Sequence, residues 1–403
     1  MRPAAEYLRS LRDALPSTTA QHLDAAIDRI AEAKEKGRRV AVITGSGPNI
    51  HEGVTTLIAE LIRKEVVDGV ITSSAVIAHE MAGTLDRVWR VTADGSTRLP
   101  LPDAVLPRGR VFEVTQLEAA ERAAVAKEMP HGWDLYDALR ESPGQSVIKA
   151  AGNMAWPLGL RTERLAREIQ SAASQYGVSL EHFAGFGADP MTMIGAAARR
   201  GVPVVVSIPQ LIGGGAVGLA IGDTWTISRR ARAVANVLAG ADVIIESAIA
   251  LTQEIHDGPF ETYTGHGIWA SWDGLPTYSL EGKTLVRIDL DPNLERAWQL
   301  ERSGCEVQKA VNLGLPKTKT TGIPFRMEMS GFARLETSIP VTADIGAVWP
   351  LIAAGLEERL GIRLDFISAP QESEHGKQMR DWIASGVRFI DREGMFRQAR
   401  HAL

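Results

Sequence analysis

Hydrophobic and polar positions alternate along the chain in two patterns, one typical of buried strands and one of amphipathic helices. Residues 38–49, RRVAVITGSGPN, are an apolar stretch ending in a glycine-rich turn, and residues 54–67 continue with helical spacing. A second apolar stretch, DGVITSSA at 68–75, ends in small polar residues. A strand, a helix and a strand in this order predict parallel strands with a right-handed crossover.

The same alternation returns after residue 160 and continues to residue 361. A helical pattern over 160–177 is followed by short apolar stretches and helical patterns over 178–248. Further strand patterns lie at 283–293 and 338–346, each followed by a helical pattern. The sequence therefore predicts an α/β fold with a mostly parallel sheet flanked by helices.

Two boundaries divide the chain into three segments. Residues 1–37 read as a helical arm, with N-caps offered by Ser17 to Thr19 and a C-cap by Gly37. Residues 38–362 form the main domain, with an insertion around 274–335, and residues 363–403 form a polar tail. Within the domain, residues 92–150 combine a Pro-rich loop with one helical pattern and suggest an insertion or a cap on the sheet, not a separate domain.

Composition narrows the class of protein. The 403 residues are 45% hydrophobic and 23% charged, with 44 Lys and Arg against 49 Asp and Glu. This excludes disorder over most of the chain and a strongly basic nucleic-acid binder. Cys305 is the only cysteine and cannot form an intrachain disulfide. With no apolar stretch of membrane-spanning length and no apolar signal segment, the sequence predicts a soluble, cytoplasmic protein.

Glycine-rich turns follow several predicted strands. The turn at 44–49, which includes Gly45, could cradle a phosphate, although glycines there could serve only to turn the chain. Thr72, Ser73 and Ser74 follow the second strand and suit ribose or phosphate, or a helix N-cap. The loops at 183–190 and 211–223 permit close approach of a ligand, or are flexible turns.

Residues 246–274 carry the densest set of chemistry-bearing side chains. Carboxylates beside aromatic rings suit a cationic amine, while the alternative is a solvated surface loop. Histidines ten positions apart without an HExxH motif argue against a metal site, so we expect no metal. The candidates are Glu246, Glu254, His256, Asp257, Glu261, His266, Trp269 and Trp272.

Acidic residues also follow the later strands. Asp289, Asp291 and Asp344 lie at the ends of strand patterns, where an acid can bind ribose hydroxyls. Each of the last two could instead cap the next helix.

The order of these segments resembles the deoxyhypusine synthase family over roughly residues 20–360. The similar stretches are 43–81, 178–193, 204–221, 240–258 and 339–360. The resemblance implies a Rossmann-like fold, NAD as cofactor, an amine substrate and a homotetramer. It places an NAD site at Asn49, Ser73, Ser74, Asp189, Gly214, Gly215, Ala343 and Asp344, and an amine pocket at Asp257, Glu261, His266 and Trp272.

One departure from the family pattern and one further resemblance bear on the reaction. Gly218 stands where the family has its catalytic lysine, and glycine cannot form an imine with a substrate. Residues 283–304 also resemble the NAD-binding part of archaeal ornithine cyclodeaminases.

Three functions are compatible with these observations. The first is an NAD-dependent enzyme that oxidises an amine or amino acid to an imine and releases a small product, with His266, His79 and Glu261 as catalytic candidates and Glu246, His256, Asp257, Trp269 and Trp272 binding substrate. The second is an aminobutyl transferase of the deoxyhypusine or homospermidine synthase type that uses another lysine, such as Lys149. The third is a non-catalytic binder of a cationic ligand.

Overall fold

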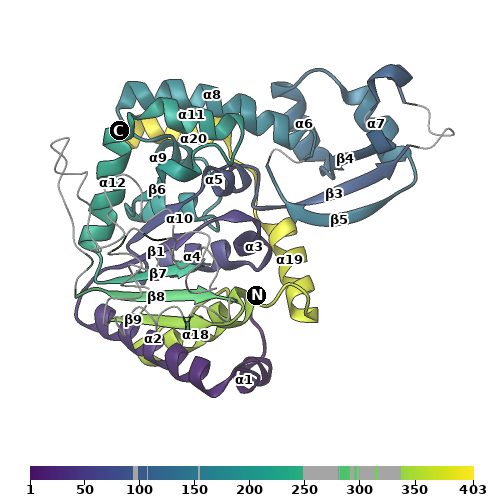
Figure 1. Cartoon of the computed structure of the whole chain (residues 1–403). Coiled ribbons are helices and arrows are strands. Elements are labelled where there is room, and N and C mark those ends of the chain that lie inside the picture. The colour runs from purple at the N-terminus through teal and green to yellow at the C-terminus, as the bar shows by residue number, and fades with distance from the viewer. Residues whose placement is uncertain are drawn as a thin grey trace.

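A six-stranded parallel sheet forms the centre of the computed structural model, which describes residues 1–93, 99–106, 108–152, 155–247, 280, 282–290, 295–296, 299, 313, 315 and 337–403. The strand order is β6-β2-β1-β7-β8-β9. The strands are β1 (Val40–Thr44), β2 (Gly69–Thr72), β6 (Val204–Val206), β7 (Val243–Ser247), β8 (Thr284–Asp289) and β9 (Ser338–Thr342). The predicted α/β fold with a mostly parallel sheet is confirmed (Figure 1).

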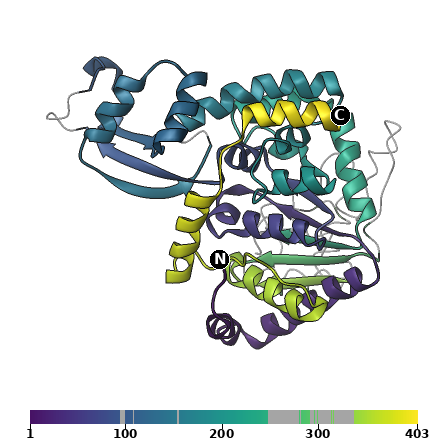
Figure 2. The same cartoon turned by 180° about the vertical axis from the view of Figure 1, so that it is seen from behind.

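Helices surround this sheet (Figure 2). In the body of the molecule they are α1 (Ala5–Asp13), α2 (Ser17–Glu35), α3 (Ser46–His51), α4 (Val54–Arg63), α5 (Ser74–Met81), α8 (Leu158–Tyr176), α9 (Leu180–Gly185), α10 (Met193–Arg200), α11 (Ala216–Thr224), α12 (Ile227–Gly240) and α18 (Ile345–Leu360), with a short 3-10 helix at Ile208–Gln210. None of the described helices is long and apolar enough to cross a membrane.

Side chains of successive strand residues alternate between two hydrophobic cores. Val40 and Val42 belong to the larger core, which α2, α4, α10 and α18 share. Ala41 and Ile43 belong to a smaller core with Val234 of α12. Because both faces are buried, β1 is apolar throughout.

Helix ends follow the local sequence closely. Side chains cap the N-termini of α5, α9, α10, α12 and α18, at Ser73, Ser179, Thr192, Thr226 and Asp344. The predicted arm helix begins one residue earlier than its expected caps, because Pro16 is the N-cap of α2 and makes no side-chain bond. Gly37 follows this helix with φ +66°, as a C-cap glycine does.

Residues 85–150, called the lobe below, form a second sheet that projects from the body (Figure 1). Its antiparallel strands are β3 (Leu85–Thr92), β4 (Val111–Thr115) and β5 (Gly144–Ala150), with helices α6 (Ala119–Glu128) and α7 (Trp133–Glu141) and short 3-10 helices at Asp103–Val105 and Arg108–Arg110. Val91, Val114 and Tyr136 lie in its apolar core. The Tyr136 hydroxyl donates to the Thr115 carbonyl at 2.9 Å.

The last forty residues form two helices that pack on the rest of the chain. Helix α19 (Glu374–Gly386) lies between the lobe and the body, where Arg87 of β3 pairs with Asp381 at 2.6 Å. Helix α20 (Arg392–Ala402) runs beside α8, where Arg392 pairs with Glu168 at 2.8 Å (Figure 2). The tail therefore joins the lobe to the body.

Candidate functional site

The carboxyl ends of the six parallel strands meet at one edge of the sheet. β1 pairs with β2 on one side and with β7 on the other, so the chain order reverses at β1. This order is that of dinucleotide-binding folds, in which the ligand lies outside the carboxyl ends where the order reverses. The position falls between the β1–α3 turn and the end of β7, where Thr44 is in register with Ser247.

Two glycines shape the turn between β1 and α3. Gly45 is extended, with φ −175° and ψ −179°, a conformation open to any residue. Gly47 lies in the first turn of α3, and a Cβ added there would meet no atom within 4 Å. The packing of the described chain therefore leaves space at Gly47 that a ligand could occupy against the backbone.

Asn49 joins the ends of β1 and β7. Its Nδ2 donates to the carbonyl of Gly45 at 2.6 Å and to that of Ser247 at 3.3 Å, while its Oδ1 accepts from the Ser247 hydroxyl at 2.5 Å. Trp349 of α18 donates to the same hydroxyl at 2.8 Å. Because Asn49 is fully buried and its amide is satisfied within the chain, its role in this structure is to hold the two strand ends together.

Ser74 performs a similar function for the glycine loop after β6. Its hydroxyl donates to the Gln210 carbonyl at 2.7 Å and accepts from the Gly214 N–H at 2.8 Å. A Cβ on Gly214 would lie 2.5 Å from the Ser74 carbonyl oxygen, and Gly215 has φ +60° and ψ −132°, which only glycine adopts readily. The loop thus needs glycine to pack against α5.

A Cβ on Gly218 would overlap the carbonyl oxygen of Leu211 and lie 2.9 Å from the Ser74 hydroxyl. The position that the resemblance aligns with the catalytic lysine therefore has no room for a side chain in this structure.

Hydroxyl oxygens gather at the carboxyl edge of the sheet. They belong to residues that end or directly follow four strands, and they are buried without a hydrogen-bond partner among the described residues: Thr44, Thr72, Ser207 and Thr342. Ser73 differs, because its hydroxyl accepts from the Val76 N–H and caps α5. An unpaired buried hydroxyl costs about 1–3 kcal/mol, so a ligand or water that bonds these groups would be stabilised here.

His79, on α5, lies against the segment that leads out of the lobe. Its Nδ1 is hydrogen-bonded to the carbonyl oxygen of Ala151, so Nδ1 carries the hydrogen and Nε2 is left as an acceptor. Burial, followed by the charge of His51, lowers the pKa of His79 to about 4. The imidazole is therefore neutral at pH 7.

Two buried glutamates flank the same region. Glu80 accepts from the N–H groups of Met193 and Ile194, at 2.8 and 3.0 Å, and caps α10. Glu52 accepts from the backbone and side-chain amides of Gln371 at 2.7 and 2.6 Å. Burial raises the pKa of each carboxyl to about 7.

The remaining candidates for the cofactor site are engaged in local bonds. Asp189 accepts from the N–H groups of Met191 at 2.8 Å and Arg388 at 3.1 Å. Asp344 caps α18 by accepting from the Gly346 N–H at 2.6 Å, and Ala343 packs against the larger core.

Glu246 is the described member of the predicted amine pocket. It is 2% exposed on β7 and pairs with Arg287 of β8 at 2.9 Å. Its carboxylate is thus already neutralised by a cation of this chain. Glu254, His256, Asp257, Glu261, His266, Trp269 and Trp272 lie outside the described residues, as do Asp291 and Cys305. In the part of the chain that is described, no three His, Cys, Asp or Glu side chains group as metal ligands would.

Charged groups from three strands meet at the junction of the lobe and the body, although they lie far apart in the sequence. Lys149 of β5 pairs with Glu113 of β4 at 2.6 Å. Asp86 of β3 accepts from the Thr115 hydroxyl at 2.7 Å, and burial raises its pKa to about 7. These residues come from three strands, so only the folded lobe brings them together.

Replacing Asp86 with Asn should reduce the loss of stability on going from about pH 5 to about pH 8. The folded pKa of Asp86 lies above its usual value of 3.8, so its contribution to stability is present below that value and is lost as pH rises through about 7. The expected difference is about 2 kcal/mol, because Asn keeps the bond to Thr115 without a charge. Urea unfolding at both pH values measures it. If the variant is the less stable protein at about pH 8, the assignment of a raised pKa is wrong.

The strand order and the edge described above define a dinucleotide-binding type of α/β fold. Residues 9–98 match the family model described as deoxyhypusine synthase. The resemblance seen in the sequence is confirmed over this segment, which contains β1, β2 and the turns that follow them. No curated protein matches the chain.

Several solved structures are similar to the chain at low identity. One is ArgZ, an arginine dihydrolase from the ornithine-ammonia cycle in cyanobacteria, with 12% identity and a TM-score of 0.40 over 86% of this chain and 32% of that chain. Another is AgrE in a binary complex with L-arginine, with 14% identity and a TM-score of 0.41 over 90% of this chain and 35% of that chain. A third is a conserved putative LOR/SDH protein from Methanococcus maripaludis S2, with 11% identity and a TM-score of 0.39 over 87% of this chain and 70% of that chain. The chain spans about a third of the length of the first two.

Proposed function

We propose that this protein binds NAD at the carboxyl edge of the sheet and oxidises an amine or amino acid next to its nitrogen. The resulting imine undergoes addition or elimination and leaves as a small-molecule product. The reversal of strand order at β1 carries the proposal, because dinucleotides bind at such positions. The family-model match over residues 9–98 supports it, since that segment supplies both turns beside the crevice.

The described residues at this edge fit a dinucleotide. The open space at Gly47 would admit a pyrophosphate close to the backbone. The buried hydroxyls of Thr44, Thr72 and Ser207 have no partner in the described chain and would bond ribose or phosphate oxygens. When bound, NAD accepts a hydride from the carbon that carries the substrate nitrogen.

His79 is the described residue best suited to accept the proton that the substrate amine loses. Its Nδ1 is held by the Ala151 carbonyl, and its Nε2 keeps a free lone pair in the neutral ring. The lowered pKa keeps the ring unprotonated at neutral pH, so Nε2 can accept a hydrogen bond from the substrate nitrogen, and the proton would pass to it only as the developing imine makes that nitrogen more acidic.

His79→Asn should lower kcat by about 100-fold or more and leave NAD affinity unchanged. The Asn amide can still donate to the Ala151 carbonyl, whereas the acceptor Nε2 is lost. The assay supplies NAD with a panel of diamines and basic amino acids and detects products by mass spectrometry. His182→Asn is the matched control, because His182 is a half-buried histidine whose pKa burial also lowers. Equal turnover of the two variants would exclude His79 as the proton acceptor.

Aminobutyl transfer through a lysine is less well supported. Gly218 has no room for a side chain, and the Lys149 ammonium is already paired with Glu113 at 2.6 Å. A small-molecule product released directly requires neither group. If NAD binds and no compound of the panel is turned over, the chain is instead a binder of a cationic ligand.

A further inference from the structure

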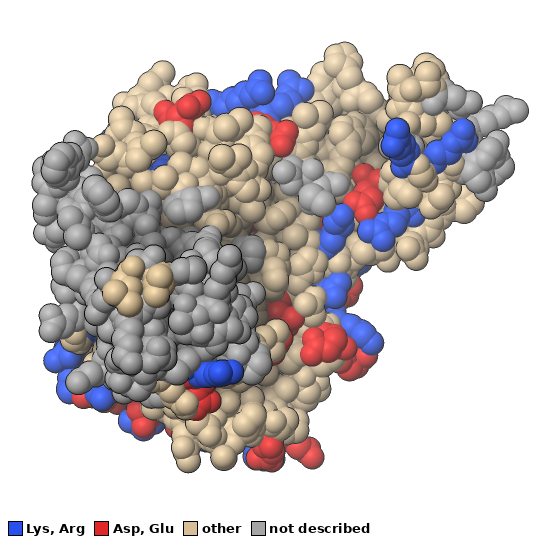
Figure 3. Space-filling model, in the orientation of Figure 1, with Lys and Arg blue, Asp and Glu red and all other residues tan. Residues whose placement is uncertain are grey.

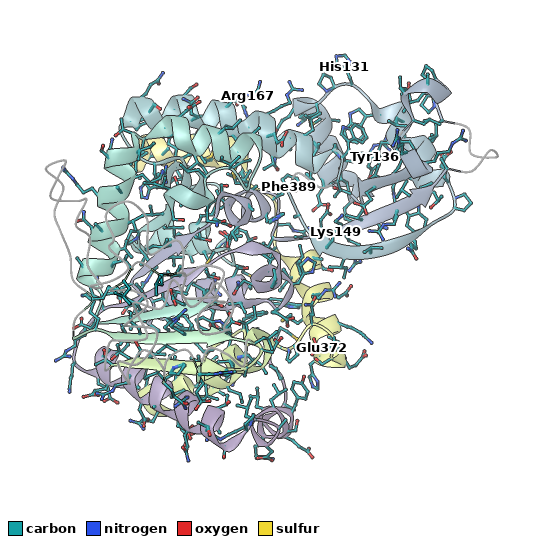
Figure 4. All side chains as sticks on the ribbon, in the orientation of Figure 1. His131, Tyr136, Lys149, Arg167, Glu372 and Phe389 are labelled. Carbon is teal, nitrogen blue, oxygen red and sulfur yellow. The ribbon has the colours of Figure 1, made fainter. Side chains whose placement is uncertain are left out.

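The lobe meets the body at a recess that four elements line. These are α3 and α5 of the body, β5 of the lobe, and α19 of the tail; α3 contacts both α5 and β5, and α19 contacts β5. In Figure 3, both Lys or Arg and Asp or Glu side chains border the notch between the lobe and the body. Figure 4 shows Lys149 at the junction, with Glu372 close to the start of α19.

Arg380 is the cation of α19 that faces the lobe. Its Nη2 donates to the carbonyl of Ile148 at 2.8 Å, which places the guanidinium beside Lys149 on β5. Its Nε is buried and has no hydrogen-bond partner among the described residues. No described carboxylate pairs with Arg380, so its charge is left without a counter-ion in that part of the chain.

Two further cations at the recess already have carboxylate partners. Arg87 uses Asp381, and Lys149 shares Glu113 with Arg90. An anion of modest size would therefore gain an ion pair with Arg380 without displacing an existing one.

His51 links this recess to the crevice. It is the last residue of α3, the helix that begins directly after β1 and its turn. Helix α3 contacts β5, the strand that carries Lys149. Burial lowers the pKa of His51, and the positive charges of Arg380 and Lys149 lower it further. A ligand held here would lie at the end of α3, one short helix away from the β1–α3 turn.

We propose that the recess binds the carboxylate of the substrate through Arg380 and His51, so that the substrate is an amino acid and not a simple amine. This inference rests on the proposed function, because it gives a second anchor to the molecule that NAD would oxidise. An Arg guanidinium with a free edge can bind a carboxylate through two parallel hydrogen bonds, and a His side chain can donate a third.

The test is the preference for an amino acid over its decarboxylated amine. With NAD present, calorimetry compares L-lysine with cadaverine and L-arginine with agmatine, on the wild type and on Arg380→Gln. We expect the wild type to bind at least one amino acid about 10- to 100-fold more tightly than its amine, and Arg380→Gln to remove that preference. Equal binding of each pair by the wild type, or an unchanged preference in the variant, would overturn the proposal.

Two controls separate the possible failures. Arg87→Gln breaks an ion pair at the same junction and should keep the preference, because Arg87 already has Asp381 as partner. Arg380→Lys keeps the positive charge and should retain part of the preference for the amino acid. This variant keeps the test valid even where Arg380→Gln folds poorly. NAD affinity is measured for the wild type and for every variant. A wild type that does not bind NAD counts against the proposed function. A wild type that binds NAD but shows no preference for the amino acid counts against the recess alone.

Discussion

Gly47→Ala is expected to weaken NAD binding by about 10-fold or more while the protein becomes no less stable. The added methyl group would occupy the space beside the β1–α3 turn, where the pyrophosphate must approach the backbone. Nothing in the described chain lies within 4 Å of that methyl position, so no internal clash opposes it. Gly47 is in a helix, where alanine is favoured over glycine by about 0.5–1 kcal/mol.

Each variant is measured by NAD titration and by thermal unfolding on the same preparation. Calorimetry gives the NAD dissociation constant, and thermal unfolding gives the stability. Gly386→Ala is the control, because it also adds a methyl group where no atom lies within 4 Å, at the end of α19. An unchanged dissociation constant in Gly47→Ala would remove this turn from the cofactor site.

Glu181→Ala should have the largest effect on stability, a loss of about 3–5 kcal/mol. Glu181 of α9 is buried and accepts from Arg230 of α12 at 2.7 Å and from the Val206 N–H at 3.0 Å. Arg230 also donates to the carbonyls of Val206 and Ile221, at 3.1 and 2.9 Å. Removing the carboxylate leaves a buried charge and a buried N–H without their partner.

The double variant Glu181→Leu with Arg230→Met serves as the control. It removes both charges together, and apolar replacement of a buried ion pair is often neutral. Urea unfolding should therefore show that the double variant recovers most of the stability lost by Glu181→Ala. A loss below about 1 kcal/mol in the single variant would show that the pair contributes little to stability.

The parallel sheet could be predicted from the sequence because its strands are continuous apolar stretches between polar helices. Val40–Thr44 is buried along its whole length, and Gly69–Thr72 likewise. Such strands stand out from amphipathic helices by length and by the absence of alternation. The strands of the lobe were not predicted, because β5 reads Gly144–Ala150 with three exposed residues and gives no apolar stretch.

The positions of the site loops were predictable, but the bonds made by their side chains were not. Ser73 and Ser74 are adjacent in sequence, yet one caps α5 and the other bonds the loop at Gln210 and Gly214. Asn49, which the resemblance places at the cofactor, satisfies its amide between two strands. Such distinctions depend on partners far away in the chain.

The recess illustrates the same limit. Arg380 contacts a carbonyl 232 positions earlier in the chain, and neither residue belongs to a recognisable motif. The sequence suggested Lys149 only as a substitute for the missing catalytic lysine. The folded lobe and the tail helix together bring Arg380 next to the strand that carries Lys149.

The central claim is that the carboxyl edge of this sheet is an NAD site. Calorimetric titration of NAD into the wild-type protein tests it most directly. The account predicts saturable binding with a dissociation constant between about 1 μM and 1 mM, weakened in Gly47→Ala and retained in Gly386→Ala. No detectable binding up to about millimolar NAD would contradict it.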